Sequence, residues 1–149
     1  MCMARKVITQ SKNSNPGMMF VLSFLVMFAV NSLVLYVAQT LFPSSIVIGT
    51  HALSYYWGIS MSMGKLALVG TFAMPFVREI EIRRGKMFES YEWMIVYFVL
   101  NFVTLWVITR FSEQFGLGVQ SWMVVASLAF VMNIAQGIVM MTIQKMQEK

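Results

Sequence analysis

Residues 18–42, MMFVLSFLVMFAVNSLVLYVAQTLF, decide the fold class of this chain. The run contains no Asp, Glu, Lys or Arg. A helix needs about 20 mostly apolar residues to cross the hydrocarbon core of a bilayer. The run is therefore predicted to span a membrane. Its length, and the further apolar runs that follow it, argue against a cleaved signal peptide.

Three more stretches have the same character, at residues 53–76, 93–111 and 119–142. Over the 149 residues, 58% are apolar and 11% are charged, whereas a soluble domain carries about 25% charged residues. A globule of this length could not shield so much apolar surface from water. We expect an all-α integral membrane protein, a four-helix transmembrane bundle. It would have tails at residues 1–17 and 143–149 and a polar loop at residues 77–92.

The basic residues indicate which side of the membrane each segment faces. Nine of the eleven lie in the two tails and the loop, and four spans would place these three segments on one side. Arg110 lies on the other side. The positive-inside rule then places both termini in the cytoplasm. The residues that set this topology are Arg78, Arg83, Arg84 and Lys86 in the loop, and Arg5, Lys6, Lys12, Lys145 and Lys149 in the tails.

The polar loop at residues 77–92 also carries four glutamates. Glu79 and Arg83 are spaced i,i+4, which favours a helical extension of the second span. Two interpretations of the loop stay open. It is either a solvated loop that only sets topology or a docking surface for a cytoplasmic partner.

Two segments of the chain resemble each other. NSLVLYV at residues 31–37 matches NFVTLWV at residues 101–107 in its Asn, central Leu and final Val. MSMGK at residues 61–65 can be set against MNIAQ at residues 132–136, where polar residues match polar ones. The chain is therefore predicted to be two fused helical hairpins of one orientation, related by an axis along the membrane normal.

Five polar side chains lie within the predicted spans, and no Asp or Glu accompanies them. They are Lys65, Asn31, Asn101, Asn133 and Gln136. A charge inside lipid costs about 2.5–3.5 kcal/mol on insertion scales, so such residues normally face the interior of a bundle. We expect these five groups to converge there. The amides would either join the helices structurally or, with Lys65, form a polar pathway or an anion-attracting site.

Small residues follow a helical spacing in two of the spans. Ser54, Gly58, Ser62 and Lys65 form one stripe, and Ala126, Ala129, Asn133, Gln136 and Gly137 form the other. Small residues let helices approach closely in a membrane. The predicted helix-packing residues are Gly58, Ser62, Gly64, Ala129 and Gly137.

Residues that carry chemistry are scarce. The single cysteine, Cys2, excludes a disulfide or a thiolate metal cluster within one chain, and no catalytic triad or phosphate-binding loop is present. His51 could ligate haem or pigment, but one histidine per chain favours a simple interfacial role. The fifteen methionines are scattered and fit apolar packing better than copper binding. We expect no enzymatic activity, no cofactor and no metal. The net charge is +5, and the basic residues lie beside the apolar spans. This position favours binding to a membrane surface over binding to nucleic acid.

The order of these features is similar to a known family. A mid-helix Asn31, a turn with Pro43, a glycine-containing second helix, Pro75 just past it and a second hairpin with Asn101 resemble the small four-helix membrane proteins named after mycobacterial-type phage holins. The resemblance covers residues 18–141 and departs at Lys65 and at the charged loop. It implies self-association that alters membrane permeability.

Three functions remain open from the sequence. The first is a holin-like protein that forms homo-oligomers in the lipid bilayer. The second is a non-catalytic accessory or assembly subunit that binds other membrane subunits. The third is a small channel or transporter organised by Lys65.

Overall fold

The protein is described by a computed structural model over residues 15–147. It is mostly helical, and a two-stranded sheet is its remaining regular structure within that range. In chain order the elements are α2 (Pro16–Leu41), β1 (Ile46–Ile48), α3 (Tyr55–Arg84), α4 (Ser90–Arg110), α5 (Ser112–Phe115), β2 (Leu117–Val119) and α6 (Trp122–Gln147). The predicted tail residues Cys2, Arg5, Lys6, Lys12 and Lys149 lie outside the described residues.

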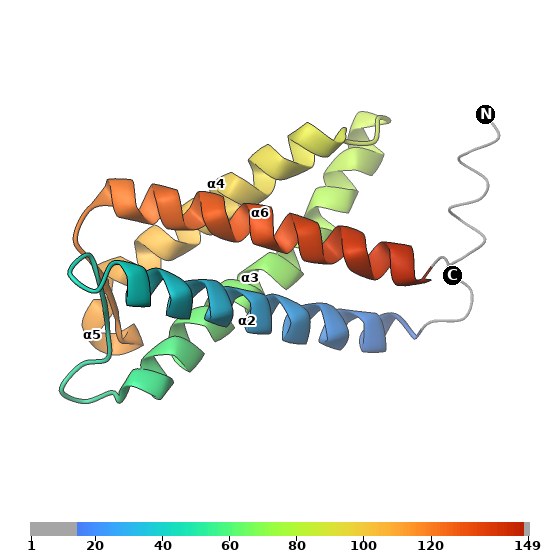
Figure 1. The fold of residues 1–149 in the computed structure, drawn as a ribbon. Coiled ribbons are helices and arrows are strands. Elements are labelled where there is room, and N and C mark those ends of the chain that lie inside the picture. The colour runs from blue at the N-terminus through green and yellow to red at the C-terminus, as the bar shows by residue number, and fades with distance from the viewer. Residues whose placement is uncertain (1–14, 148–149) are drawn as a thin grey trace.

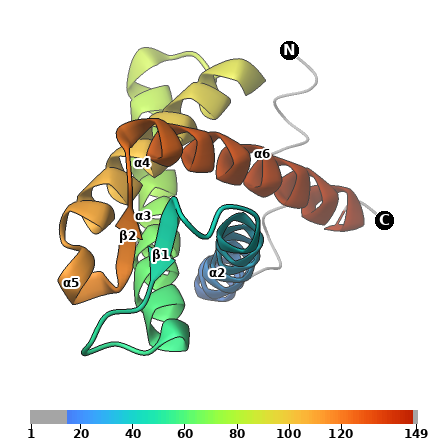
Figure 2. The same ribbon diagram turned by 60° about the vertical axis from the view of Figure 1, so that its left-hand side comes forward.

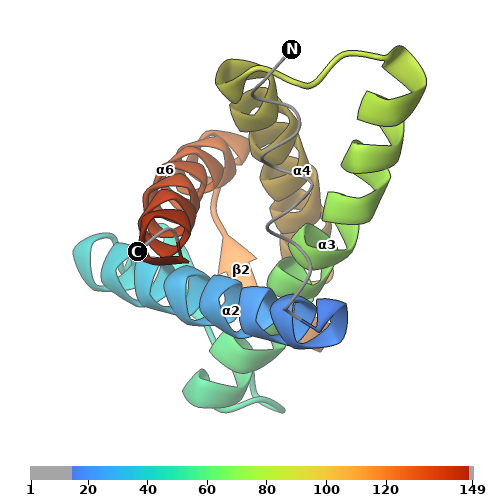
Figure 3. The same cartoon turned by 90° about the vertical axis from the view of Figure 1, so that its right-hand side faces the viewer.

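Four of the helices, α2, α3, α4 and α6, are long and apolar enough to cross a membrane. This confirms the prediction of four apolar helices of membrane-spanning length, which indicates a multi-pass membrane protein. In space, α2 contacts α3 and α6, and α4 contacts the same two helices. The four therefore follow one another in a ring, which is visible in the view along their length (Figure 3). The helices α3 and α4 are joined at one end of the molecule, called here the hairpin end, and the sheet and α5 lie at the opposite, sheet end (Figure 1).

The ends of the helices follow from local sequence. Pro16 is the first residue of α2, where a missing N–H costs nothing, and Pro43 follows soon after the last residue. The helix α3 ends at Gly85, whose positive φ of 66° is a conformation that glycine adopts without strain. The helix α4 begins with a capping box in which Glu89 and Glu92 each bind the other's backbone N–H.

The polar loop at residues 77–92 is shorter in the structure than in the prediction. The helix α3 continues to Arg84, so only residues 85–89 connect it to α4. Pro75 lies inside α3 and not past its end. The missing N–H of a proline breaks one backbone bond, but the polar residues after Pro75 continue the helix, supported by the Glu79–Arg83 pair.

A small antiparallel sheet joins the connection that follows α2 to the connection that precedes α6. Ile46 pairs with Val119, Val47 with Gly118 and Ile48 with Leu117 (Figure 2). The all-α prediction omits this sheet. Three-residue strands are too short to show the alternation by which a strand is recognised. The sheet links the first helical hairpin to the second through backbone hydrogen bonds.

The apolar core lies between the helices and reaches the sheet. Its fully buried members include Leu35, Met63, Leu66, Leu105 and Met132, and the strand residues Ile46 and Leu117 complete it at the sheet end. Many large apolar side chains on the outer faces of the helices are exposed. A hydrocarbon solvent would match such a surface.

Candidate functional site

Three buried amide side chains meet between α2, α4 and α6. The Nδ2 atom of Asn101 donates a hydrogen bond to Oε1 of Gln136 at 2.9 Å. The Nε2 atom of Gln136 donates to Oδ1 of Asn31 at 2.6 Å. The exposed fractions of Asn31, Asn101 and Gln136 are 0%, 1% and 5%. We call these three residues the amide cluster.

Each partner in the amide cluster comes from a different helix. Asn31 lies on α2, Asn101 on α4 and Gln136 on α6. A carboxamide carries both a donor and an acceptor, so one glutamine can bridge an Oδ1 and an Nδ2 at the same time. In a bilayer the groups have no water to bind, and hydrogen bonds of this kind hold helices together. The arrangement therefore joins three helices through one side chain.

Asn133 makes a separate contact between helices. Its Nδ2 atom donates to the backbone oxygen of Met94 on α4 at 2.9 Å. Because Asn133 and Gln136 lie on the same helix, α6 is bound to α4 at two places. Within the described residues, three buried side-chain atoms have no hydrogen-bond partner: Asn31 Nδ2, Ser32 Oγ and Tyr97 Oη.

Lys65 lies against a different group from the amide cluster. Its Nζ atom is 3.3 Å from the centre of the Phe115 ring, in a cation–π contact with the short helix α5. The expected convergence of all five polar groups thus holds for Asn31, Asn101 and Gln136 and fails for Lys65 and for Asn133, which binds the backbone of α4 instead. An ammonium has no acceptor atom, so it cannot replace the bridging amide, whereas an aromatic face attracts it without any hydrogen-bond acceptor.

Gly58 and Ser62, two other residues of the stripe that contains Lys65, also face α5 and the turn after it. The Oγ atom of Ser62 donates to the backbone oxygen of Phe115 at 2.8 Å. A Cβ atom on Gly58 would lie 2.8 Å from the backbone oxygen of Gly116. The stripe therefore packs on the sheet end of the second hairpin. Phe115 and Gly116 were not singled out as candidate residues from the sequence, although an aromatic residue before a turn glycine offered a weak signal.

The remaining predicted packing residues divide into two groups. Ala129 is fully buried in the core, and a Cβ on Gly64 would meet the ring of Phe28 at an ordinary 3.8 Å. Gly137 is exposed, and no described side chain lies within 4 Å of where its Cβ would be. It therefore takes no part in helix packing inside the chain.

No known protein family, curated protein or solved structure matches this chain. Its function must therefore be inferred from its own residues.

Few side chains that could bind a metal or a cofactor lie close to one another in the described residues. In residues 15–147 no three side chains of His, Cys, Asp or Glu gather closely enough to hold a metal ion. His51 is exposed in the segment between β1 and α3.

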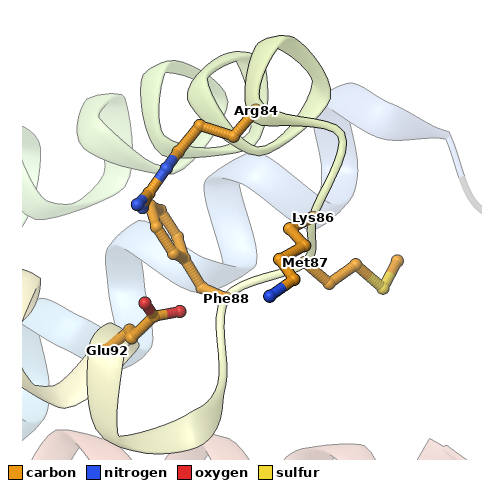
Figure 4. Close-up of a pocket in the computed structure, with 5 residues that line it drawn as sticks. All are labelled: Arg84, Lys86, Met87, Phe88 and Glu92. Carbon is orange, nitrogen blue, oxygen red and sulfur yellow. The ribbon is translucent and has the colours of Figure 1, made fainter.

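The predicted topology residues lie around the turn from α3 to α4. Arg78 is exposed on α3, and Arg83 forms an ion pair with Glu79, its Nε atom 3.2 Å from Oε1. The guanidinium of Arg84 lies over the ring of Phe88, with its Cζ atom 5.4 Å from the ring centre. A pocket of about 330 Å³ opens beside them (Figure 4). It is lined by Arg84, Lys86, Met87, Phe88 and Glu92.

Proposed function

We propose that this chain is a non-catalytic multi-pass membrane protein that associates with copies of itself, and that any change in permeability arises between copies. The observation that carries the proposal is the bridging position of Gln136. Its donor and acceptor are both used by Asn31 and Asn101 within one chain. Gln136 therefore serves to join helices and is not free to line a path for a solute.

The contact of Lys65 supports the same conclusion. Its charge lies on the face of Phe115 and not among the amides. A channel organised by an intramembrane lysine would need that charge turned toward a polar route. The holin-like alternative needs no such route in a single chain, because the pore would form between chains.

The exposed face of α6 offers a surface for another copy. Gly137 is exposed there, and its neighbours Ile134, Ile138 and Met141 are exposed as well. A glycine on a lipid-facing helix lets a second helix approach closely, where dispersion contacts then form over a large area. We infer that this face contributes to the homo-oligomer.

The experiment compares two glycines that have open space beside them. In Gly137→Leu and Gly17→Leu the new Cβ atom meets no other described part of the chain within 4 Å, so both variants should fold. We expect chemical cross-linking in membranes to lose its oligomer bands for Gly137→Leu and to keep them for Gly17→Leu. We also expect induced expression of Gly137→Leu to depolarise the membrane less than expression of Gly17→Leu does, as measured with a membrane-potential dye. Equal bands in both variants, or healthy growth with abundant wild-type oligomer, would contradict the proposal.

We propose further that the chain is two hairpins of the same orientation, with both termini in the cytoplasm. Two features support this. One strand follows the first helix of each hairpin, and four of the described basic residues lie at the hairpin end: Arg78, Arg83, Arg84 and Lys86. Cys2 is the single cysteine of the chain, so it reports on the N-terminus directly. A membrane-impermeant maleimide should label Cys2 only after the membrane is opened. Labelling of intact cells would reverse the assigned orientation.

An accessory role in a larger membrane complex is the second candidate. The pocket at the hairpin end favours it, because its charged lining is open to a partner. Purification in a mild detergent separates the two. The accessory role requires a stoichiometric partner protein, whereas the first proposal requires a homogeneous homo-oligomer.

A further inference from the structure

The turn from α3 to α4 brings acidic and basic side chains together, and the acidic ones are engaged with their neighbours. Glu79 is paired with Arg83. The Oε1 atom of Glu81 accepts a hydrogen bond from the backbone N–H of Phe88 at 2.8 Å.

The two glutamates at the start of α4 are engaged by the backbone of their own helix. The Oε2 atom of Glu92 accepts a hydrogen bond from the backbone N–H of Glu89 at 3.0 Å, and the Glu89 side chain accepts one in return. These contacts fix the turn without using the charges of Arg84 or Lys86. Among the described residues, neither cation has a carboxylate within ion-pair distance.

Arg84 and Lys86 instead line the pocket (Figure 4). The ring of Phe88 supports the guanidinium of Arg84 from one side, which limits the directions in which its N–H groups can point. Glu92 lies across the pocket on the first turn of α4. Two cations and one carboxylate leave the lining with a net positive charge. A single anionic group would neutralise it.

Two large apolar side chains are exposed at the hairpin end. Ile82 on the last turn of α3 is 74% exposed, and Met87 in the pocket wall is 76% exposed. Cations beside exposed apolar side chains, at the end of a spanning helix, are typical of the level of lipid headgroups.

We propose that this pocket binds the headgroup of an anionic phospholipid, with the phosphate diester held between Arg84 and Lys86. A guanidinium can bind two phosphate oxygens at once, and a lysine adds a compact charge beside it. Glu92 accepts a hydrogen bond from a headgroup hydroxyl, which makes a phosphoglycerol headgroup the best match. Met87, in the pocket wall, contacts the upper part of the acyl chains.

The proposal differs from diffuse attraction of basic residues to an acidic membrane. Diffuse attraction depends on total charge, so removal of any nearby cation should weaken it equally. A site depends on which cation is removed. Arg83 and Arg84 are adjacent and carry the same charge, but Arg83 is paired with Glu79 and does not line the pocket. They therefore form a matched pair for a test.

The experiment uses the full chain purified in a neutral detergent, with phosphatidylglycerol or phosphatidylcholine added. Lipid retention is read by native mass spectrometry and lipid-induced stabilisation by thermal unfolding. We expect phosphatidylglycerol to be retained and to raise the unfolding temperature, and phosphatidylcholine to do neither. Arg84→Gln and Lys86→Gln should each weaken retention about tenfold, the effect of losing one charge-assisted hydrogen bond, while Arg83→Gln stays close to the wild type.

Each other outcome overturns the site. Equal loss in Arg83→Gln and Arg84→Gln would show diffuse attraction, and equal retention of the two lipids would show no headgroup selectivity. If glycerol phosphate raises the unfolding temperature at the same concentration as the lipid, the pocket is a site for soluble anions. If Arg84→Gln does not fold, Arg84→Lys provides the test, because it keeps the charge and should retain lipid at an intermediate level.

Discussion

Replacing Gln136 by leucine removes the side chain that joins Asn31 to Asn101. The substitution breaks the bond from Asn101 Nδ2 at 2.9 Å and the bond to Asn31 Oδ1 at 2.6 Å. An interhelical hydrogen bond in a membrane contributes about 0.6 kcal/mol on average and about 1.7 kcal/mol at most, so the two together contribute about 1 to 3 kcal/mol. Leucine is apolar and of similar size, so the cavity it leaves should add little to this cost.

The measurement is the free energy of unfolding in mixed detergent micelles, titrated with a denaturing detergent and followed by circular dichroism. Ser127→Ala is the matched control on the same helix. Its Oγ atom is exposed and donates only to the backbone oxygen of Met123 one turn away. We expect Ser127→Ala to change the free energy of unfolding by less than about 0.5 kcal/mol, the usual limit for a surface substitution.

A double-mutant cycle makes the test specific. Asn31→Leu and Gln136→Leu should couple by about 0.5 kcal/mol or more, because they remove the same hydrogen bond. Additive effects would refute the reasoning, as would a Gln136→Leu variant no less stable than Ser127→Ala. Either result would mean that the amide cluster does not hold the three helices together.

Two further pairs of substitutions test the sheet end. Gly58→Ala should lower the free energy of unfolding by about 1–3 kcal/mol, because its new Cβ would lie 2.8 Å from the backbone oxygen of Gly116, whereas Gly64→Ala should be neutral or stabilising. The same unfolding titration reads both, and equal effects would contradict the geometry. Lys65→Met should cost about 0.5–2 kcal/mol through loss of the cation–π contact, and Phe115→Leu should make that cost disappear. If Lys65→Met instead leaves stability unchanged and abolishes ion flux in proteoliposomes, the lysine serves transport and our assignment fails.

Composition and hydropathy were sufficient to predict the four apolar helices, because the requirement for a long uncharged run is strict in lipid. The positions of Asn31, Asn101 and Gln136 were also predictable, since polar groups at mid-depth have no other place to go. The hydrogen bonds between these amides were not predictable, because the choice of partners depends on how the helices are rotated about their axes. That rotation is set by the packing of many side chains and not by one motif.

The sheet and the position of Pro75 show two further limits of the sequence, whereas the helical extension of the second span was predicted from the Glu79–Arg83 spacing. A helix pattern does not reveal a pair of three-residue strands that meet only in three dimensions, so β1 and β2 remained hidden. Pro75 was placed past a helix end because proline usually marks one. In the structure the residues after Pro75 continue the helix, and α3 ends at Arg84.

Lys65 and Gln136 explain why the two hairpins differ in their polar contacts despite their resemblance. The predicted internal repeat would set these two residues at equivalent positions, yet only Gln136 contacts Asn31 and Asn101. A bridge between an Oδ1 and an Nδ2 needs a group that both donates and accepts, and an ammonium only donates. A lysine in place of Gln136 would also bring a charge into the most buried part of the molecule, at a cost of several kcal/mol. The cation instead lies on Phe115, so one hairpin supplies the buried bridge and the other supplies the contact that holds α5 at the sheet end.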